Sequence, residues 1–316
     1  MNPDISTENT IEPISIERID DIPLLVALQQ KIGIADVIDR IIPRHWLQQG
    51  FSLGQLVLGW NTFILSEGDH RKVSVRDWSR EHRVVLEELI GSPIRDTDFT
   101  DDRLGQVLHH LSDDESWYAI EDSLWQNSVS VYSLSPDRVR LDATNANGYH
   151  TVTEESIMQI GYNSKNNPLP QVKVMAGSVD CGINGHLVAT EVVSGQKADD
   201  RLYAPVLERL RNTLQQSGLL YLGDSKMGAK NTRADIAQHG DFYLVPLAKV
   251  GEIKQLLEHC VETIVSGTQE VKAKPTLLAT LIYDAQKKHL IAAGRLLLSH
   301  NLLRDDSESM LHLLSW

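Results

Sequence analysis

Two aspartates occupy strand positions where an acid suits metal chemistry. Asp142 lies in RVRLDATNANG, residues 138–148, where apolar and charged residues alternate and we expect the aspartate to take a core-facing position. Asp224 ends the apolar run of LLYLGDSKMG, residues 219–228. Two carboxylates held close together repel, and a divalent cation relieves that repulsion; hard oxygen ligands favour Mg²⁺ or Mn²⁺. Two such ions can activate water and stabilise the leaving oxygen in phosphodiester cleavage.

A plainer interpretation stays open for each aspartate, because Asp at a strand end is often a turn or capping residue. Asp224, followed by Ser225 and Lys226, fits that description. The pair gains meaning if the two strands are parallel neighbours. The carboxyl ends of parallel strands at a switch point are where α/β sheets place their ligands.

The elements that would position these acids follow residue 128. Runs with period-2 alternation or β-branched residues predict strands at 129–134, 138–144, 172–179 and 186–195. Helical patterns at 197–218 and 231–240 alternate with buried strands at 219–224 and 241–248. Antiparallel strands followed by right-handed crossovers predict a mixed α/β sheet with helices on its faces. Residues 276–300 predict a hairpin that turns at AQKK.

The preceding part of the chain follows a different pattern. Residues 1–13 are polar and predict a disordered leader, and residues 14–127 predict an all-helical domain. Ser52 is expected to cap one helix, and Gly91 to end another that spans 73–90. The basic run 71–83 contains acids as well, so ion pairing within the helix is weighed against a DNA-facing role.

Composition restricts the class of protein. Residues 1–135 hold 11 Lys and Arg against 23 Asp and Glu, so most of the net charge of −13 lies there, and the remainder is near neutral. Basic patches in the remainder could therefore still meet phosphates. Two cysteines, Cys181 and Cys260, indicate no disulfide framework, and we expect a cytoplasmic protein. No apolar run approaches ~18 residues, so no membrane-spanning helix is expected.

Three blocks of the sequence resemble one enzyme family. They are LDATNANGYH around Asp142, the stretch from Gly161 to Leu210 that begins GYNSKNN, and LLYLGDSKMGAKNTRADIAQHGDFYLVPL around Asp224. Over residues 14–250 the chain resembles bacterial insertion-sequence DDE transposases of the IS-four group, whose catalytic domain has a ribonuclease H-like fold. The family's G-N-x-x-D segment is altered here to GQKAD, residues 195–199.

The resemblance implies a domain plan and a reaction. Residues 14–127 would bind DNA or dimerise, 128–250 would be the first part of the ribonuclease H-like core, and 251–316 would begin an insertion region. Asp142 and Asp224 would be the first two acids of a DDE triad. They would bind Mg²⁺ or Mn²⁺ in a two-metal site that cleaves double-stranded DNA at the element ends and transfers it to a target. The active form would be a homodimer. Four lysines are expected to meet phosphates: Lys165, Lys173, Lys226 and Lys230, although Lys165 and Lys173 could equally be solvated surface residues.

The family's third acid has no counterpart in its expected context. The pattern Y-x-x-R-x-x-x-E-x-x-x-x-x-x-K does not occur in residues 225–316, and Tyr283 is followed by DAQKKHL. We therefore expect a C-terminally truncated copy with impaired catalysis. Two alternatives stay open: a non-catalytic DNA- or partner-binding remnant of a transposase, and a ribonuclease H-like nuclease that takes a third acid from residues 252–270.

Overall fold

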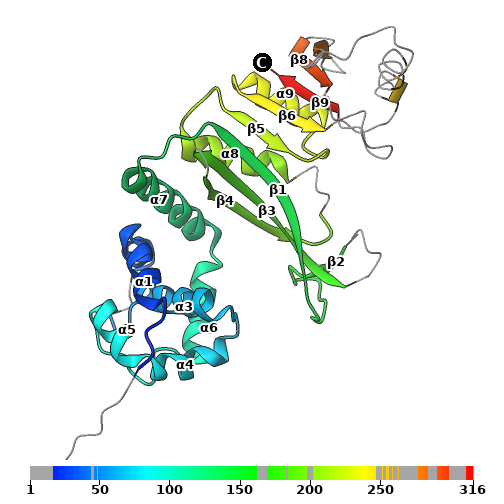
Figure 1. Cartoon of the computed structure of the whole chain (residues 1–316). Coiled ribbons are helices and arrows are strands. Elements are labelled where there is room, and N and C mark those ends of the chain that lie inside the picture. Colours follow the sequence, from blue (N-terminus) through cyan, green and yellow to red (C-terminus); the bar gives the residue numbers. More distant parts are fainter. Residues whose placement is uncertain are drawn as a thin grey trace, which may run out of the picture. The chain divides into compact units, whose positions relative to one another are not determined.

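The chain divides into two compact units, Met1–Val131 and Tyr132–Trp316, which are described separately (Figure 1). The computed structural model describes the residues that follow: 17–43, 46–47, 49–161, 169–181, 184–197, 202–246, 251, 254–255, 258 and 262, with the backbone of 277–283, 290–298 and 311–315. The leader expected at 1–13 lies outside these residues. In the described part, no helix combines the length and apolar character needed to cross a membrane.

Unit 1 is built of helices in its described part, and the last of them runs one residue into unit 2. They are α1 (Ile22–Lys31), α2 (Ile34–Ile41), α3 (Leu53–Glu67), α4 (Lys72–Glu81), α5 (Arg83–Ile90), α6 (Asp101–Leu111) and α7 (Asp114–Tyr132). Helix α3 is the most buried, because apolar side chains line nearly all of its circumference. Phe63 of α3 packs edge to face on Trp78 of α4, and Phe51, just before α3, packs in the same way on Phe99.

The predicted helix ends can be compared with the observed ones. Ser52 forms a capping box with Gln55 at the start of α3, and Gly91 ends α5 with a φ of 74°, as expected. The single helix predicted over 73–90 was wrong, because it breaks into α4 and α5 at His82. His82 leaves the helical region with φ −113° and ψ 27°, and its ring nitrogen Nδ1 lies 2.9 Å from the carbonyl of Trp78.

The strand predicted at 129–134 was also wrong, because helix α7 continues to Tyr132. Val129 and Val131 favour strands by local propensity, but they extend a long helix that is already anchored in unit 1. Trp125 is buried, and the side-chain amide of Asn127 donates to the Ile32 carbonyl at 2.9 Å. Tertiary contacts therefore outweigh the propensity of these β-branched residues.

The described part of unit 2 contains a mixed sheet of nine strands, in agreement with the predicted class. The strands are β1 (Arg138–Asn147), β2 (Gln159–Ile160), β3 (Pro170–Cys181), β4 (Asn184–Ser194), β5 (Leu220–Gly223), β6 (Phe242–Pro246), β7 (Leu277–Tyr283), β8 (Leu290–Leu298) and β9 (Leu311–Ser315). Their order is β2-β3-β1-β5-β6-β9-β8-β7, with β4 paired to β3. Strands β1, β5 and β6 are parallel, and the other pairs are antiparallel. The hairpin expected near the end is β7 with β8.

Helices α8 (Tyr203–Leu214) and α9 (Lys230–Gln238) pack against this sheet (Figure 1). Strand β1 turns Val139 and Leu141 to a buried face, and β3 adds Met175 and Val179 to the same layer. Gly177 lets α8 approach closely, because a Cβ there would lie 2.7 Å from a methyl group of Leu210. The buried layer beneath α8 thus fixes β1, which carries Asp142, and the neighbouring strand β3.

Candidate active site

Asp142 lies in the middle of β1, on its exposed side. The expected core-facing position was wrong: the buried positions of the strand are Val139 and Leu141, and alternation places Asp142 on the face of Arg140. Arg140 forms a charge-assisted pair with Asp180 of β3, at 2.8 Å. The backbone N–H of Ala143 donates to Asp142 Oδ1 at 2.9 Å. Asp142 is therefore a solvated carboxylate on a rigid strand.

The strand register brings Asp142 and Asp224 together. Leu141 is paired with Gly223 in the parallel ladder between β1 and β5, and each aspartate is the next residue of its own chain segment. Adjacent strands lie roughly 5 Å apart, so the two carboxylates leave the sheet from neighbouring positions. The parallel pairing that the sequence required for this arrangement is confirmed.

Asp224 is held by a tight turn directly after β5. Its Oδ1 accepts the backbone N–H groups of Lys226 at 2.9 Å and Met227 at 3.3 Å. Gly223 must be small, because a Cβ there would lie 2.4 Å from the Met227 sulfur. The turn-residue interpretation of Asp224 and the ligand interpretation are thus compatible, since the turn uses one carboxylate oxygen only.

Tyr203 is a member of the site that sequence reasoning missed. It is fully buried at the first residue of α8, and its hydroxyl donates to Asp224 Oδ1 at 2.6 Å. Burial raises the pKa of Tyr203 far above its ordinary value, and the hydrogen bond and charge of Asp224, then the charge of Asp142, raise it further. The hydroxyl therefore stays protonated and orients Asp224. Only the packing of α8 places it there, and no spacing in the sequence points to it.

The donor set fits a hard divalent cation in part. In Asp142 and Asp224 all hydrogen bonds within the described part are accepted by Oδ1, so the second oxygen of each carboxylate is available as a ligand. Mg²⁺ needs one or two protein carboxylates, with water and phosphate oxygens as its other ligands. Among the residues that the structure describes, no cluster of three His, Cys, Asp or Glu side chains could hold a metal ion. A third acid that would complete a metal-binding group with this pair is not found in that part of the chain.

The four lysines expected to meet phosphates differ in their surroundings. Lys173 was placed wrongly at the surface: it is buried, its ammonium donates to the Lys197 carbonyl at 2.6 Å, and burial lowers its pKa. Lys226 and Lys230 are exposed and follow Asp224 closely, in its turn and at the start of α9. Lys165 lies outside the described residues. Lys226 and Lys230 are thus the two that can present charge beside the aspartates.

The basic run 71–83 of unit 1 is largely ion-paired, which favours the pairing interpretation over a DNA-facing one. The pairs join Arg71 to Asp69, Lys72 to Asp101, Arg80 to Asp77 and Arg83 to Glu87. Two of them, Arg80–Asp77 and Arg83–Glu87, have the (i,i+3) and (i,i+4) spacing of helix-surface pairs.

Residues 14–120 match a family model described as a domain of unknown function, DUF4277. The match covers most of unit 1 and leaves out the paired aspartates. No curated protein matches the chain.

Three solved structures show weak similarity to the chain. A piggyBac transposase synaptic complex with hairpin DNA shares 12% identity at a TM-score of 0.39, over 93% of this chain and 60% of that one. The NurA nuclease from Sulfolobus solfataricus shares 8% at 0.29, over 67% and 80%, and a Mos1 transposase paired-end complex with the left transposon end shares 8% at 0.24, over 72% and 77%. This chain thus spans about 60% of the length of the piggyBac protein.

Proposed function

We propose that this chain is a DDE transposase-type protein whose Asp142 and Asp224 bind Mg²⁺ or Mn²⁺ for phosphodiester chemistry on double-stranded DNA. The observation that supports the proposal is the parallel pairing of Leu141 with Gly223, because Asp142 and Asp224 are the residues that follow this pair in β1 and directly after β5. The sequence blocks that resemble the IS-four group surround the same two acids. Those blocks and that register are independent supports, since one is local sequence and the other is tertiary structure.

Each residue has a distinct role in this proposal. Asp142 and Asp224 would supply one oxygen each to the cation, while Tyr203 and the turn amides keep the other oxygen of Asp224 in place. The bound ion would supply Lewis acidity and an activated water. Lys226 and Lys230 would attract the DNA backbone toward the acids. Binding of element ends and homodimerisation during activity are expectations that come from the resemblance.

Metal binding by the full-length chain tests the proposal without requiring catalysis. We expect Mn²⁺, followed by electron paramagnetic resonance, to bind the protein saturably and to be displaced by Mg²⁺. The double variant Asp142→Asn, Asp224→Asn should lose this site, with an affinity at least about tenfold lower, since both charged ligands are removed. Glu208→Gln is the matched control, because it removes an exposed carboxylate of α8 away from the pair.

An unchanged Mn²⁺ affinity in the double variant would refute the proposed site. DNA cleavage then separates the activity from the binding. With two acids and no third one in its described part, the chain should nick supercoiled plasmid in Mg²⁺ or Mn²⁺ only weakly. Any nicking should disappear in the double variant and persist in Glu208→Gln.

A second candidate is a non-catalytic DNA- or partner-binding protein of transposase descent. The observation that favours it is the lack of a three-acid cluster in the described residues. Mn²⁺ binding together with retention of duplex DNA and no nicking at any metal concentration would support this candidate. Robust plasmid cleavage by the purified chain would exclude it and would indicate a third acid from residues 252–270.

A further inference from the structure

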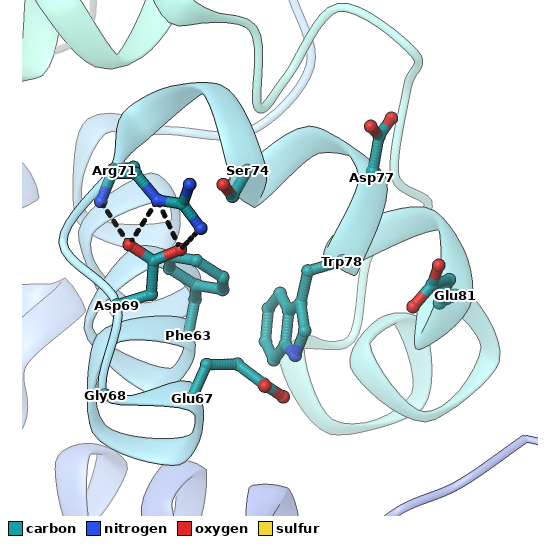
Figure 2. Close-up of a pocket in the computed structure, with 9 residues that line it drawn as sticks. All are labelled: Phe63, Glu67, Gly68, Asp69, Arg71, Ser74, Asp77, Trp78 and Glu81. Atoms are coloured by element: carbon teal, nitrogen blue, oxygen red, sulfur yellow. Dashed lines mark hydrogen bonds and ion pairs between the residues drawn. The ribbon is translucent and has the colours of Figure 1, made fainter.

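Unit 1 contains an open pocket of about 660 Å³ between the end of α3 and one side of α4 (Figure 2). Carboxylates dominate its lining: Glu67, Asp69, Asp77 and Glu81. Phe63 and Trp78 supply its aromatic wall; both are almost fully buried and pack edge to face with ring centroids 5.5 Å apart. This combination of negative charge and aromatic surface differs from the aspartate pair of unit 2, and it suits a cation with an organic body.

The charges of the pocket do not cancel. Its one basic residue, Arg71, is committed to Asp69 by a fork of hydrogen bonds at 2.8–3.0 Å, drawn as dashed lines in Figure 2. These bonds lower the pKa of Asp69 to about 2, so this pair is neutral as a whole. Asp77 contacts Arg80 at 3.5 Å. Glu67 and Glu81 form no ion pair within 4 Å in the described part of the chain, although Glu67 also interacts with the charge of Arg18. The four acids of the lining therefore outnumber its basic residue.

Trp78 provides a second and independent sign of a ligand. Its side chain is 5% exposed, and its indole Nε1 has no hydrogen-bond partner among the described residues. A buried N–H without an acceptor destabilises the fold, so such groups are rare without a reason. Figure 2 shows the indole nitrogen on the side of the ring turned toward Glu67. The pocket therefore offers surplus acceptors and one donor that lacks an acceptor.

We propose that this pocket binds an arginyl residue of a partner polypeptide. A guanidinium brings several N–H donors and a positive charge to Glu67 and Glu81, and its flat surface suits an aromatic wall. Glu67 is exposed, so its carboxylate can turn toward the guanidinium. This movement would make the indole N–H of Trp78 accessible to the ligand. The peptide carbonyl next to the arginine then accepts the indole N–H.

Other cations fit this set of groups less well. A Ca²⁺ ion takes about six to eight oxygen ligands, and among the described residues the carboxylates of this pocket belong to no group of three that could hold a metal ion. A polyamine satisfies the carboxylates but carries no acceptor for the Trp78 N–H. An arginyl peptide is the ligand that supplies both the donors and the acceptor. The inference rests on unit 1 alone, and its failure would leave the proposed metal site in unit 2 untouched.

Titration of the ¹⁵N-labelled full-length chain with N-acetyl-arginine amide, and then with Gly-Arg-Gly, tests the proposal. We expect saturable binding and a downfield shift of one indole N–H resonance, which Trp78→Phe identifies by its loss. The double variant Glu67→Gln, Glu81→Gln should weaken binding at least about tenfold, because it removes both surplus charges. Glu88→Gln and Asp102→Asn are matched controls in unit 1, both exposed and outside the pocket.

Two further probes give the outcomes that would overturn the proposal. N-acetyl-citrulline amide keeps the carbonyl and shape but lacks the charge, and it should not bind. Spermidine should bind more weakly and leave the Trp78 resonance in place. Equal binding of citrulline and arginine amides, an unshifted Trp78 resonance at saturation, or an unchanged affinity in the Glu67→Gln, Glu81→Gln variant would each refute the arginyl site.

Discussion

The aspartate pair of unit 2 and the acidic pocket of unit 1 both gather carboxylates, but they present them differently. Asp142 and Asp224 follow the paired residues Leu141 and Gly223 of two parallel strands, and among the described residues each keeps one carboxylate oxygen out of hydrogen bonds. In the pocket, Glu67 and Glu81 come from two helices and stand around aromatic rings. The first arrangement suits a small hard ion, and the second suits a larger organic cation.

The difference teaches that the number of acids in a cluster does not define its ligand. Four carboxylates line the pocket and two form the strand-end pair, yet the smaller group is the better candidate for a metal. The backbone settings differ: Asp142 and Asp224 follow the paired residues of two adjacent strands, whereas the four acids of the pocket come from the end of α3, the loop after it and α4. The surrounding groups differ as well: Tyr203 donates a hydrogen bond to Asp224, whereas the indole N–H of Trp78 has no acceptor among the described residues.

Removal of the Tyr203 hydroxyl should have the largest effect of the changes that sharpen this comparison. In Tyr203→Phe, Asp224 keeps its turn amides but loses its 2.6 Å hydrogen bond. Loss of such an outer partner typically weakens metal binding 10- to 100-fold, so the Mn²⁺ affinity should fall by about tenfold. Tyr149→Phe, at a position 92% exposed, is the control and should change nothing. Equal Mn²⁺ affinities for both variants would show that Tyr203 has only a packing role.

Matched glycine substitutions test whether the two sites depend on backbone in the same way. Gly223→Ala places a Cβ against Met227 just before Asp224, and we expect a loss of about 1–3 kcal/mol in the free energy of unfolding together with weaker Mn²⁺ binding. Gly68 borders the pocket with a φ of 63° and open space around it, so Gly68→Ala should cost only about 1 kcal/mol of backbone strain.

Urea unfolding followed by hydrogen exchange separates the stability losses of the two variants, because the backbone amides of each unit report the protection of that unit alone. Gly68→Ala should lower protection in unit 1 and leave Mn²⁺ binding intact. If Gly68→Ala also weakened Mn²⁺ binding, the two sites would be energetically coupled, and the distinction between them would fail.

A smaller effect is expected in the pH dependence of the free energy of unfolding of unit 2, through Tyr221. Burial, with a further contribution from the charge of Asp241, raises the pKa of Tyr221 to about 12. An unfolded tyrosine loses its proton near pH 10, so between about pH 10 and 12 the folded state holds the extra proton. The free energy of unfolding of unit 2 must then fall as pH rises through this range, by about 1 kcal/mol at pH 11.

The variant Tyr221→Phe should remove this part of the decrease in the free energy of unfolding at alkaline pH. Stability curves against pH for both chains provide the measurement, with Tyr149→Phe as the exposed control. Parallel alkaline curves for the two chains would contradict the predicted linkage.

The sequence predicted those features that depend on local pattern. Period-2 runs indicated β3, β4 and the β7–β8 hairpin, and the Ser52 cap and the Gly91 helix end follow from simple side-chain and backbone chemistry. The sequence left the parallel pairing of the two aspartate strands as a condition, and the register of β1 with β5 fulfils it. The metal-binding roles of Asp142 and Asp224 stay predictions.

The misplaced features depend on contacts that no local pattern reveals. Val129 and Val131 have strand propensity, but they lie in α7, which the hydrogen bond from Asn127 to the Ile32 carbonyl anchors in unit 1. Lys173 is charged and was assigned to the surface, yet a carbonyl of Lys197 satisfies it in a buried position. Asp142 was expected on the buried face, although Arg138 and Arg140 show that its side of β1 carries charge. Tyr203 reaches Asp224 only through the packing of α8.

The two aspartates differ in how firmly the backbone holds them. Asp142 is paired with Ala176 inside the long β1–β3 ladder, whereas Asp224 lies just past the last pair of the short strand β5. The amide of Asp142 should therefore exchange with solvent only when the sheet opens, while the amides of Lys226 and Met227 exchange when the turn alone opens. A cation that joins the two carboxylates would then slow exchange in the turn and leave β1 unchanged. Asp142 would then keep its position in the sheet, while Asp224 would move with its turn when the ion binds.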